Sequence, residues 1–198
     1  LIASKGSSTF SAITPMGRQH ENDREATAAD LKWLADPAEE PEPFGDGGTK
    51  MAWNTFNVVS IYPNGNPVMS DVNQRWVGDC CACAVIASMA YLYPRFVKHI
   101  IKDNMDKTYT VTMYDPKGKQ ISVGVGGDYF IGNSGDLGAL GGRNKEVTWA
   151  TILEKAMIKW NQIYQGSSNV GGIGTEYVSA IFTGDGESVG FGANALIA

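Results

Sequence analysis

The chain has 198 residues, of which 43% are hydrophobic and 19% charged, values typical of a globular protein with one substantial core. Its net charge of −5 argues against nucleic acid or an anionic membrane as the main partner. No apolar run approaches the roughly 20 residues of a membrane-spanning helix, so the sequence predicts no transmembrane segment. All three cysteines lie between Cys80 and Cys83, which argues against a disulfide framework and an ordinary zinc site.

Three parts follow one another along the chain. Residues 1–50 are predicted to be an N-terminal arm or prosegment with a short helix over residues 27–35, capped by Thr27. An acidic, proline- and glycine-rich stretch then reads as a linker. Residues 51–184 are predicted to form the folded lobe. Residues 185–198 are rich in glycine and are predicted to be an exposed connection between lobes or a cleavage region.

The folded part combines helices with a hairpin, which predicts an α+β fold. Residues 80–92 and 94–103 are predicted to be helical, and residues 149–164 give the best amphipathic pattern. Residues 108–114 and 120–125 are rich in β-formers around a turn and predict the hairpin. The helix from residue 80 is apolar nearly all round, so we expect it to run through the middle of the domain.

Cys80 is the candidate nucleophile because it opens this helix directly after Gly78 and Asp79. Unpaired N–H groups and the positive end of the helix dipole meet there, which favours the thiolate that attacks carbonyls. Gln74, six residues earlier, can supply an amide N–H to an oxyanion. The alternative for a cysteine in an apolar helix is a small buried hydrophobe. We expect that role for Cys83, and the role of Cys81 stays open.

Two blocks of the sequence resemble the calpain family of cysteine proteases. Residues 70–88 are similar to the family's Asp-x-x-Gln-Gly-x-x-Gly-Asp-Cys-Trp motif and to the alanine-rich helix that follows it. Residues 149–164 are similar to the family's Trp-x-x-Leu-Leu-Glu-Lys-Ala helix. The hairpin lies between the two blocks, as it does in the family, and the resemblance covers about residues 63–184.

The resemblance implies a papain-like fold. This chain would be its mainly helical N-terminal lobe, with a central cysteine helix and a small β-hairpin, and the second, β-rich lobe would be absent from it. By motif position Cys80 is the nucleophile and Gln74 the oxyanion donor. The implied function is that of a cysteine endopeptidase that hydrolyses protein or peptide substrates through an acyl-enzyme on Cys80. The implied partner is a C-terminal lobe or fragment of the same precursor, which carries the histidine and asparagine.

Calpain protease cores also hold calcium, and Asp71 and Glu154 match two of its carboxylate ligands by motif position. Calcium takes oxygen ligands that include backbone carbonyls, so the carbonyls of Asn64 and Asn66 are weaker candidates. The alternatives are a turn cap for Asp71 and a surface ion pair with a lysine of the same helix for Glu154.

The sequence departs from the family at Arg75, where the motif has glycine, and at Cys81, where it has the tryptophan that lines the cleft. A thiol protease also needs a general base. His99 is expected at the surface of the same lobe and His20 in the arm, so we expect the base on a partner fragment released by maturation. The alternative is a calpain-like module without catalysis that acts as a binding or regulatory surface. The absence of a starting methionine favours a secreted or cell-envelope protein of a bacterium.

Overall fold

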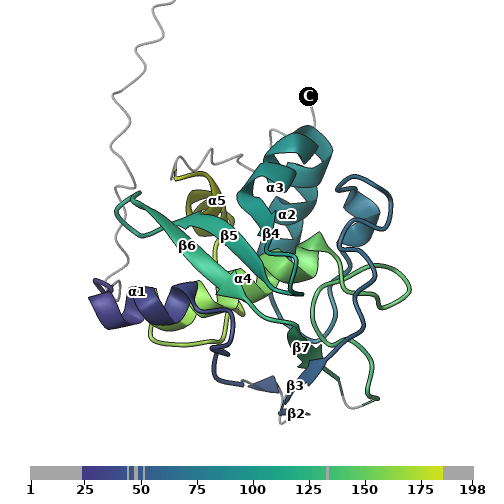
Figure 1. Ribbon diagram of the computed structural model, residues 1–198, viewed down its shortest axis with the longest axis horizontal. Coiled ribbons are helices and arrows are strands. Elements are labelled where there is room, and N and C mark those ends of the chain that lie inside the picture. The colour runs from purple at the N-terminus through teal and green to yellow at the C-terminus, as the bar shows by residue number, and fades with distance from the viewer. Residues whose placement is uncertain (1–23, 44, 47–48, 51, 133, 185–198) are drawn as a thin grey trace, which may run out of the picture.

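The computed structural model describes residues 24–43, 45–46, 49–50, 52–132 and 134–184 (Figure 1). The predicted connection 185–198 and His20 lie outside these residues. The fold is mixed α+β, as predicted. Its helices are α1 (Ala28–Ala35), a 3-10 turn η1 (Met69–Asp71), α2 (Cys80–Leu92), α3 (Pro94–Ile100), α4 (Trp149–Tyr164) and α5 (Thr175–Thr183). Its strands are β1 (Gly45–Asp46), β2 (Thr49–Lys50), β3 (Ala52–Thr55), β4 (Ile101–Asp103), β5 (Tyr109–Tyr114), β6 (Gln120–Val125) and β7 (Asp128–Ile131).

The strands form small antiparallel sheets. β4, β5 and β6 make one sheet in that order, while β3 pairs with β7 and β1 with β2. The predicted hairpin is confirmed as β5 and β6. Buried residues face each other across it, with Val111 opposite Val123 and Met113 opposite Ile121. One face of this sheet is therefore apolar and faces the core.

The C-terminal boundary of the helix predicted over residues 94–103 is wrong. α3 stops at Ile100, and Ile101 begins β4, where it pairs with Val111 of β5. β-branched residues favour a strand once a neighbouring strand is available. Within the described residues no single helix is long and apolar enough to cross a membrane. Only α2 and α3 taken together have the required length and composition, and the chain bends by 112° between them.

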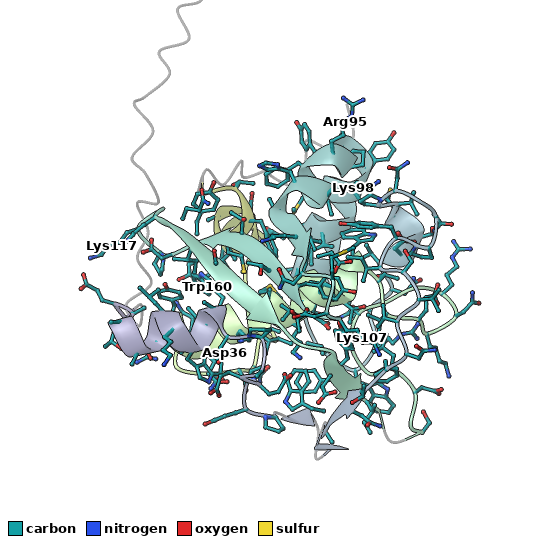
Figure 2. The ribbon with its side chains drawn as sticks, in the orientation of Figure 1. Asp36, Arg95, Lys98, Lys107, Lys117 and Trp160 are labelled. Carbon is teal, nitrogen blue, oxygen red and sulfur yellow. The ribbon has the colours of Figure 1, made fainter. Side chains whose placement is uncertain are left out.

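Helix α4 is the centre of the fold and runs behind the three-stranded sheet (Figure 1). Thr148 caps it by accepting a hydrogen bond from the Ala150 N–H at 3.3 Å. All of its residues except Gln162 are buried. Burial of a tryptophan such as Trp160 contributes on the order of 5 kcal/mol. The indole of Trp160 also donates to the Tyr114 carbonyl at 2.7 Å, which ties the helix to β5 (Figure 2).

Helix α2 does not run through the middle of the domain, so that expectation is wrong. Its buried residues are Ala82, Ile86, Met89 and Ala90, which fall on one face at positions i, i+4, i+7 and i+8. The opposite face is exposed. Cys80 and Ala84 on this face are small, so their contact with water has a small cost, but Tyr91 and Leu92 at the end of the helix are large and also exposed.

The described part of the N-terminal arm, residues 24–43, is packed on the core. Leu34 of α1 is fully buried, and α1 lies against β6 and α4. Two lysines of α4 hold this segment: Lys155 pairs with Glu40 at 2.6 Å, and Lys159 donates to the Asp36 carbonyl at 2.8 Å. Burial, with the charge of Lys155 second, lowers the pKa of Lys159 to about 8. The segment is therefore integral to this domain rather than solvated.

Candidate active site

Cys80 is the first residue of α2, and its side chain is exposed. The first backbone hydrogen bond of the helix runs from the Cys83 N–H to the Asp79 carbonyl at 3.0 Å. The Cys80 N–H precedes this first bond and lies at the positive end of the helix dipole. The structure thus confirms the predicted place of Cys80, on an accessible helix N-terminus.

A pair of buried carboxyl groups lies beneath this helix start. Asp79 and Glu154 are each 1% exposed, and Glu154 belongs to the central helix α4. Burial raises the pKa of Asp79 to about 6, and burial together with the charge of Asp79 raises that of Glu154 well above its ordinary value. The dry surroundings and the neighbouring acid therefore favour the protonated form of Glu154.

The carboxyl pair also has partners on both sides. Glu154 accepts a hydrogen bond from the Leu140 N–H at 2.9 Å, and Asp79 accepts one from the Cys83 thiol at 3.5 Å. The pair thereby links three segments: the loop before α4, the helix α4 and the first turn of α2. The alternative of a surface ion pair for Glu154 is wrong, because Lys155 and Lys159 bind the N-terminal segment instead.

Gln74 is exposed on the loop that leads into α2. This loop is anchored to residues 138–142: Asn73 exchanges backbone hydrogen bonds with Gly141, and the Trp76 N–H donates to the Gly138 carbonyl at 3.0 Å. The amide of Gln74 donates to the Val77 carbonyl at 2.9 Å. An amide nitrogen carries two hydrogens, so one of them remains to serve an oxyanion.

Asp71 is a buried cap that joins its loop to α4. Its carboxylate accepts hydrogen bonds from the Asn64 amide at 2.8 Å, the Val68 N–H at 3.2 Å and the Trp149 indole at 2.7 Å. Its backbone carbonyl accepts another from the Thr148 hydroxyl at 3.0 Å. The alternative of a turn cap is therefore confirmed.

The two carboxyls of the predicted calcium site, Asp71 and Glu154, have no hydrogen-bond partner in common among the bonds described above. The carbonyl of Gly65, in the predicted loop between Asn64 and Asn66, accepts from the Lys98 ammonium at 2.7 Å. Among the described residues, no group of three acidic, histidine or cysteine side chains could hold a metal ion. This arrangement does not fit a calcium ion shared by the two carboxyls. Calcium stays a prediction from the resemblance and enters no step below.

The described histidine is not placed to serve Cys80. His99 is exposed on α3, which begins beyond the C-terminal end of α2. Cys80 lies at the other end of α2, a helix of 13 residues and therefore roughly 18 Å long. Within the part of the chain that the structure describes, Cys80 consequently has no histidine base.

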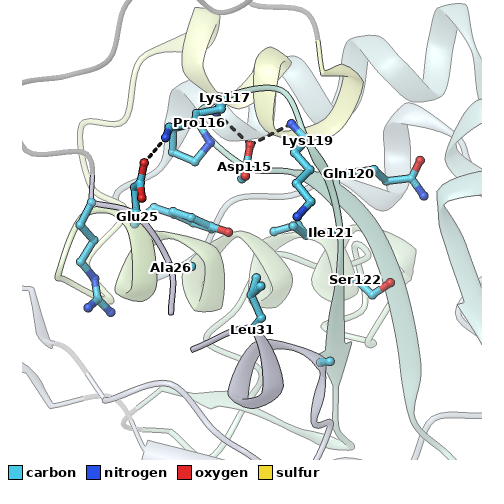
Figure 3. A pocket seen from close by; sticks show the side chains of 13 residues that line it. Glu25, Ala26, Leu31, Asp115, Pro116, Lys117, Lys119, Gln120, Ile121 and Ser122 are labelled. Carbon is cyan, nitrogen blue, oxygen red and sulfur yellow. Dashed lines mark hydrogen bonds and ion pairs between the residues drawn. The ribbon is translucent and has the colours of Figure 1, made fainter. Parts of the chain in front are cut away.

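A pocket lies elsewhere, between α1, the β5–β6 turn and the end of α4 (Figure 3). It has a volume of about 470 Å³ and is lined by Leu31, Ile121 and Tyr164 among others. Two of its charged side chains, Lys117 and Glu25, form an ion pair with each other (Figure 3). No cysteine or histidine lines it, so it is not part of the candidate active site.

Comparison with known proteins adds no relative: no protein-family model matches the chain, and no curated protein matches it significantly. The likeness to calpains therefore rests on the two motifs.

Two features of the site were not predicted from the sequence. The first is the pairing of Asp79 with Glu154, for which a glutamate inside the apolar pattern of residues 149–164 was the available signal. The second is Trp76, which is 45% exposed on the loop between Gln74 and Cys80. A half-exposed tryptophan four residues before the nucleophile offers a surface on which a bound peptide can pack.

Proposed function

We propose that this chain is the nucleophile-bearing lobe of a papain-like cysteine endopeptidase related to the calpains. The observation that carries the proposal is an exposed cysteine at the first residue of a helix, preceded by a loop that carries an exposed glutamine. The loop is fixed by backbone pairing of Asn73 with Gly141, so Gln74 and Cys80 are held on one rigid framework. A binding surface alone needs neither the thiol nor the amide.

The chemistry assigned to these residues is acyl transfer. The Cys80 sulfur attacks the carbonyl carbon of a peptide bond, and the carbonyl oxygen takes up negative charge. The Cys80 N–H and the second N–H of the Gln74 amide stabilise this oxyanion. The C–N bond then breaks, the leaving amine takes a proton, and water hydrolyses the thioester and regenerates the thiol.

A histidine outside the described residues must supply the proton to the amine. We propose that it belongs to a second, β-rich lobe that packs across the exposed start of α2. The carboxyl pair has a positioning role in this scheme. Asp79 and Glu154 are buried together at the start of α2, and the hydrogen bond that Glu154 accepts from the Leu140 N–H fixes the loop beside them.

Active-site-directed labelling tests the proposal on natively purified protein, together with any polypeptide that copurifies. A peptidyl epoxide should alkylate Cys80 and leave Cys81 and Cys83 unmodified, as read by mass spectrometry of the digested protein. Hydrolysis of unfolded casein should be lost in Cys80→Ala and kept in Cys81→Ser, which is the matched control. Gln74→Ala should lower kcat by about 100-fold, as expected for one oxyanion donor.

The opposite result supports the alternative function. If the epoxide modifies all three cysteines at equal rates and casein stays intact, the chain is a binding or regulatory module. The missing base within the described residues is the observation that favours that reading. Denaturing mass spectrometry of the same sample bears on the proposed lobe: a second polypeptide with histidine and asparagine supports it, and a single species contradicts it.

A further inference from the structure

Cys80 and Cys83 form a Cys-x-x-Cys pattern at the start of a helix, with Cys81 between them. The proposed peptidase chemistry uses only Cys80. Cys80 is the first residue of α2, Cys83 lies one turn later, and all three residues are thiols in the structure. A Cys-x-x-Cys pair at a helix N-terminus is the arrangement of thiol–disulfide redox motifs.

Helix geometry selects one pair of the three. With a rise of about 1.5 Å and a turn of about 100° per residue, the Cα atoms of Cys80 and Cys83 lie about 5 Å apart on one face. That separation is within the range of roughly 4.4–6.8 Å that a disulfide requires. Cys81 is turned by about 100° from Cys80 and by about 200° from Cys83, so its side chain diverges from both.

The first turn can make the remaining adjustment. Cβ atoms three residues apart on a helix are about 5–6 Å from each other, and a disulfide brings them to about 4 Å. Cys80 precedes the first backbone hydrogen bond of the helix, which the Cys83 N–H donates. The Cys80 N–H therefore donates no hydrogen bond within α2, and rotation of the Cys80 side chain about its Cα–Cβ bond can bring its sulfur toward Cys83.

The surroundings of the two sulfurs differ in a complementary way. Cys80 is exposed, whereas Cys83 is partly buried and donates its S–H to Asp79 Oδ1 at 3.5 Å. Burial raises the pKa of Cys83, and the charge of Asp79 raises it further. Cys83 is thus a protonated thiol with a proton acceptor, next to the thiol that solvent reaches.

We propose that Cys83 is the resolving thiol of Cys80, and that the two form a reversible disulfide when a peroxide oxidises Cys80. In the first step the Cys80 thiolate attacks a peroxide oxygen; an S–O bond forms, the O–O bond breaks, and hydroxide leaves. In the second step the Cys83 sulfur attacks the sulfenic sulfur and its proton passes to Asp79. The S–S bond forms, the S–O bond breaks, and the oxygen leaves as water once it has taken up that proton.

Two electrons pass from the sulfurs to the peroxide, and an external dithiol reverses the reaction by thiol–disulfide exchange. The disulfide blocks attack by Cys80 and protects it from irreversible oxidation. This inference concerns the two thiols alone and holds whether or not the protein cleaves peptides.

The test uses dilute full-length protein treated with hydrogen peroxide, then denatured and alkylated for intact mass measurement. Cys81→Ser leaves only the proposed pair. It should lose two hydrogens and both reactive thiols, and dithiothreitol should restore both. Cys83→Ser should instead gain two or three oxygens on Cys80, and dithiothreitol should not restore that thiol. Circular dichroism checks that both variants fold, and Cys83→Ala provides a second version if the serine disturbs the core.

Three results would overturn the inference. One is oxidation of Cys80 in Cys81→Ser directly to sulfinic acid. Another is a reversible Cys80–Cys81 disulfide that forms equally fast in Cys83→Ser and in the unsubstituted protein. The third is a disulfide between two molecules instead of within one, seen as a dimer on a non-reducing gel. A failed casein assay leaves all three readouts interpretable, because they measure thiols and mass.

Discussion

Replacing Asp71 with alanine removes the acceptor of three side-chain hydrogen bonds. The Trp149 indole is fully buried, so its N–H cannot find water and incurs a desolvation cost of about 1–3 kcal/mol. The Asn64 amide and the Val68 N–H are only partly buried and together add about 1–2 kcal/mol. The expected loss is about 2–5 kcal/mol, which for a protein of this size lowers the Tm by roughly 10 °C.

Thermal and urea unfolding, followed by circular dichroism, measure this loss in EDTA and again in excess calcium. Asp128→Ala is the matched control: it removes a carboxylate that accepts an exposed hydrogen bond from Thr55, and it should cost less than about 1 kcal/mol. A structural Asp71 predicts the same loss in both buffers. If the protein and Asp71→Ala were equally stable in EDTA and differed only with calcium, Asp71 would be a metal ligand and the hydrogen-bond reasoning would be refuted.

Two further predictions concern the packing of the N-terminal segment and the buried acids. Gly124→Ala places a Cβ 2.4 Å from the Ala35 carbonyl oxygen, so it should cost about 1–3 kcal/mol and speed proteolysis of residues 24–43; Gly127→Ala, with 3.6 Å to its nearest neighbour, should not. The pKa of Asp79 is about 6 in the folded protein against an ordinary 3.8, so the folded state binds this proton more tightly than the unfolded state does. The free energy of unfolding should therefore fall as the pH rises from about 4 to 6, by at most about 3 kcal/mol. Asp79→Asn should make that fall smaller in urea titrations across this range, and the part that remains belongs to Glu154, whose pKa is also raised; an unchanged pH profile would contradict the assignment.

Local patterns determined the elements that depend on neighbouring residues. The Thr27 cap of α1 is confirmed, with its hydroxyl accepting the Asp30 N–H at 3.2 Å. The hairpin β5–β6, the α4 boundaries and the position of Cys80 at a helix start were also predictable. Caps, turns and apolar periodicity act over a few residues, so the sequence states them directly.

The tertiary structure alone decided which helix is central. Periodicity gave α4 one apolar stripe, yet its lysines are buried as well. Lys155 and Lys159 find their partners 115 and 123 residues earlier in the chain, at Glu40 and Asp36. Because such partners satisfy a buried charge, a residue that looks solvent-facing can lie in the core.

The same reason separates what was foreseen at the site from what was not. The sequence alone placed Cys80 and Gln74 near a helix start, since the helix and its dipole are local. It assigned Glu154 to calcium or to a surface ion pair, because nothing near it in sequence indicates Asp79, 75 positions away. A carboxyl pair needs two distant segments to bring their acids into one dry place, and only the packing of α2 on α4 does that.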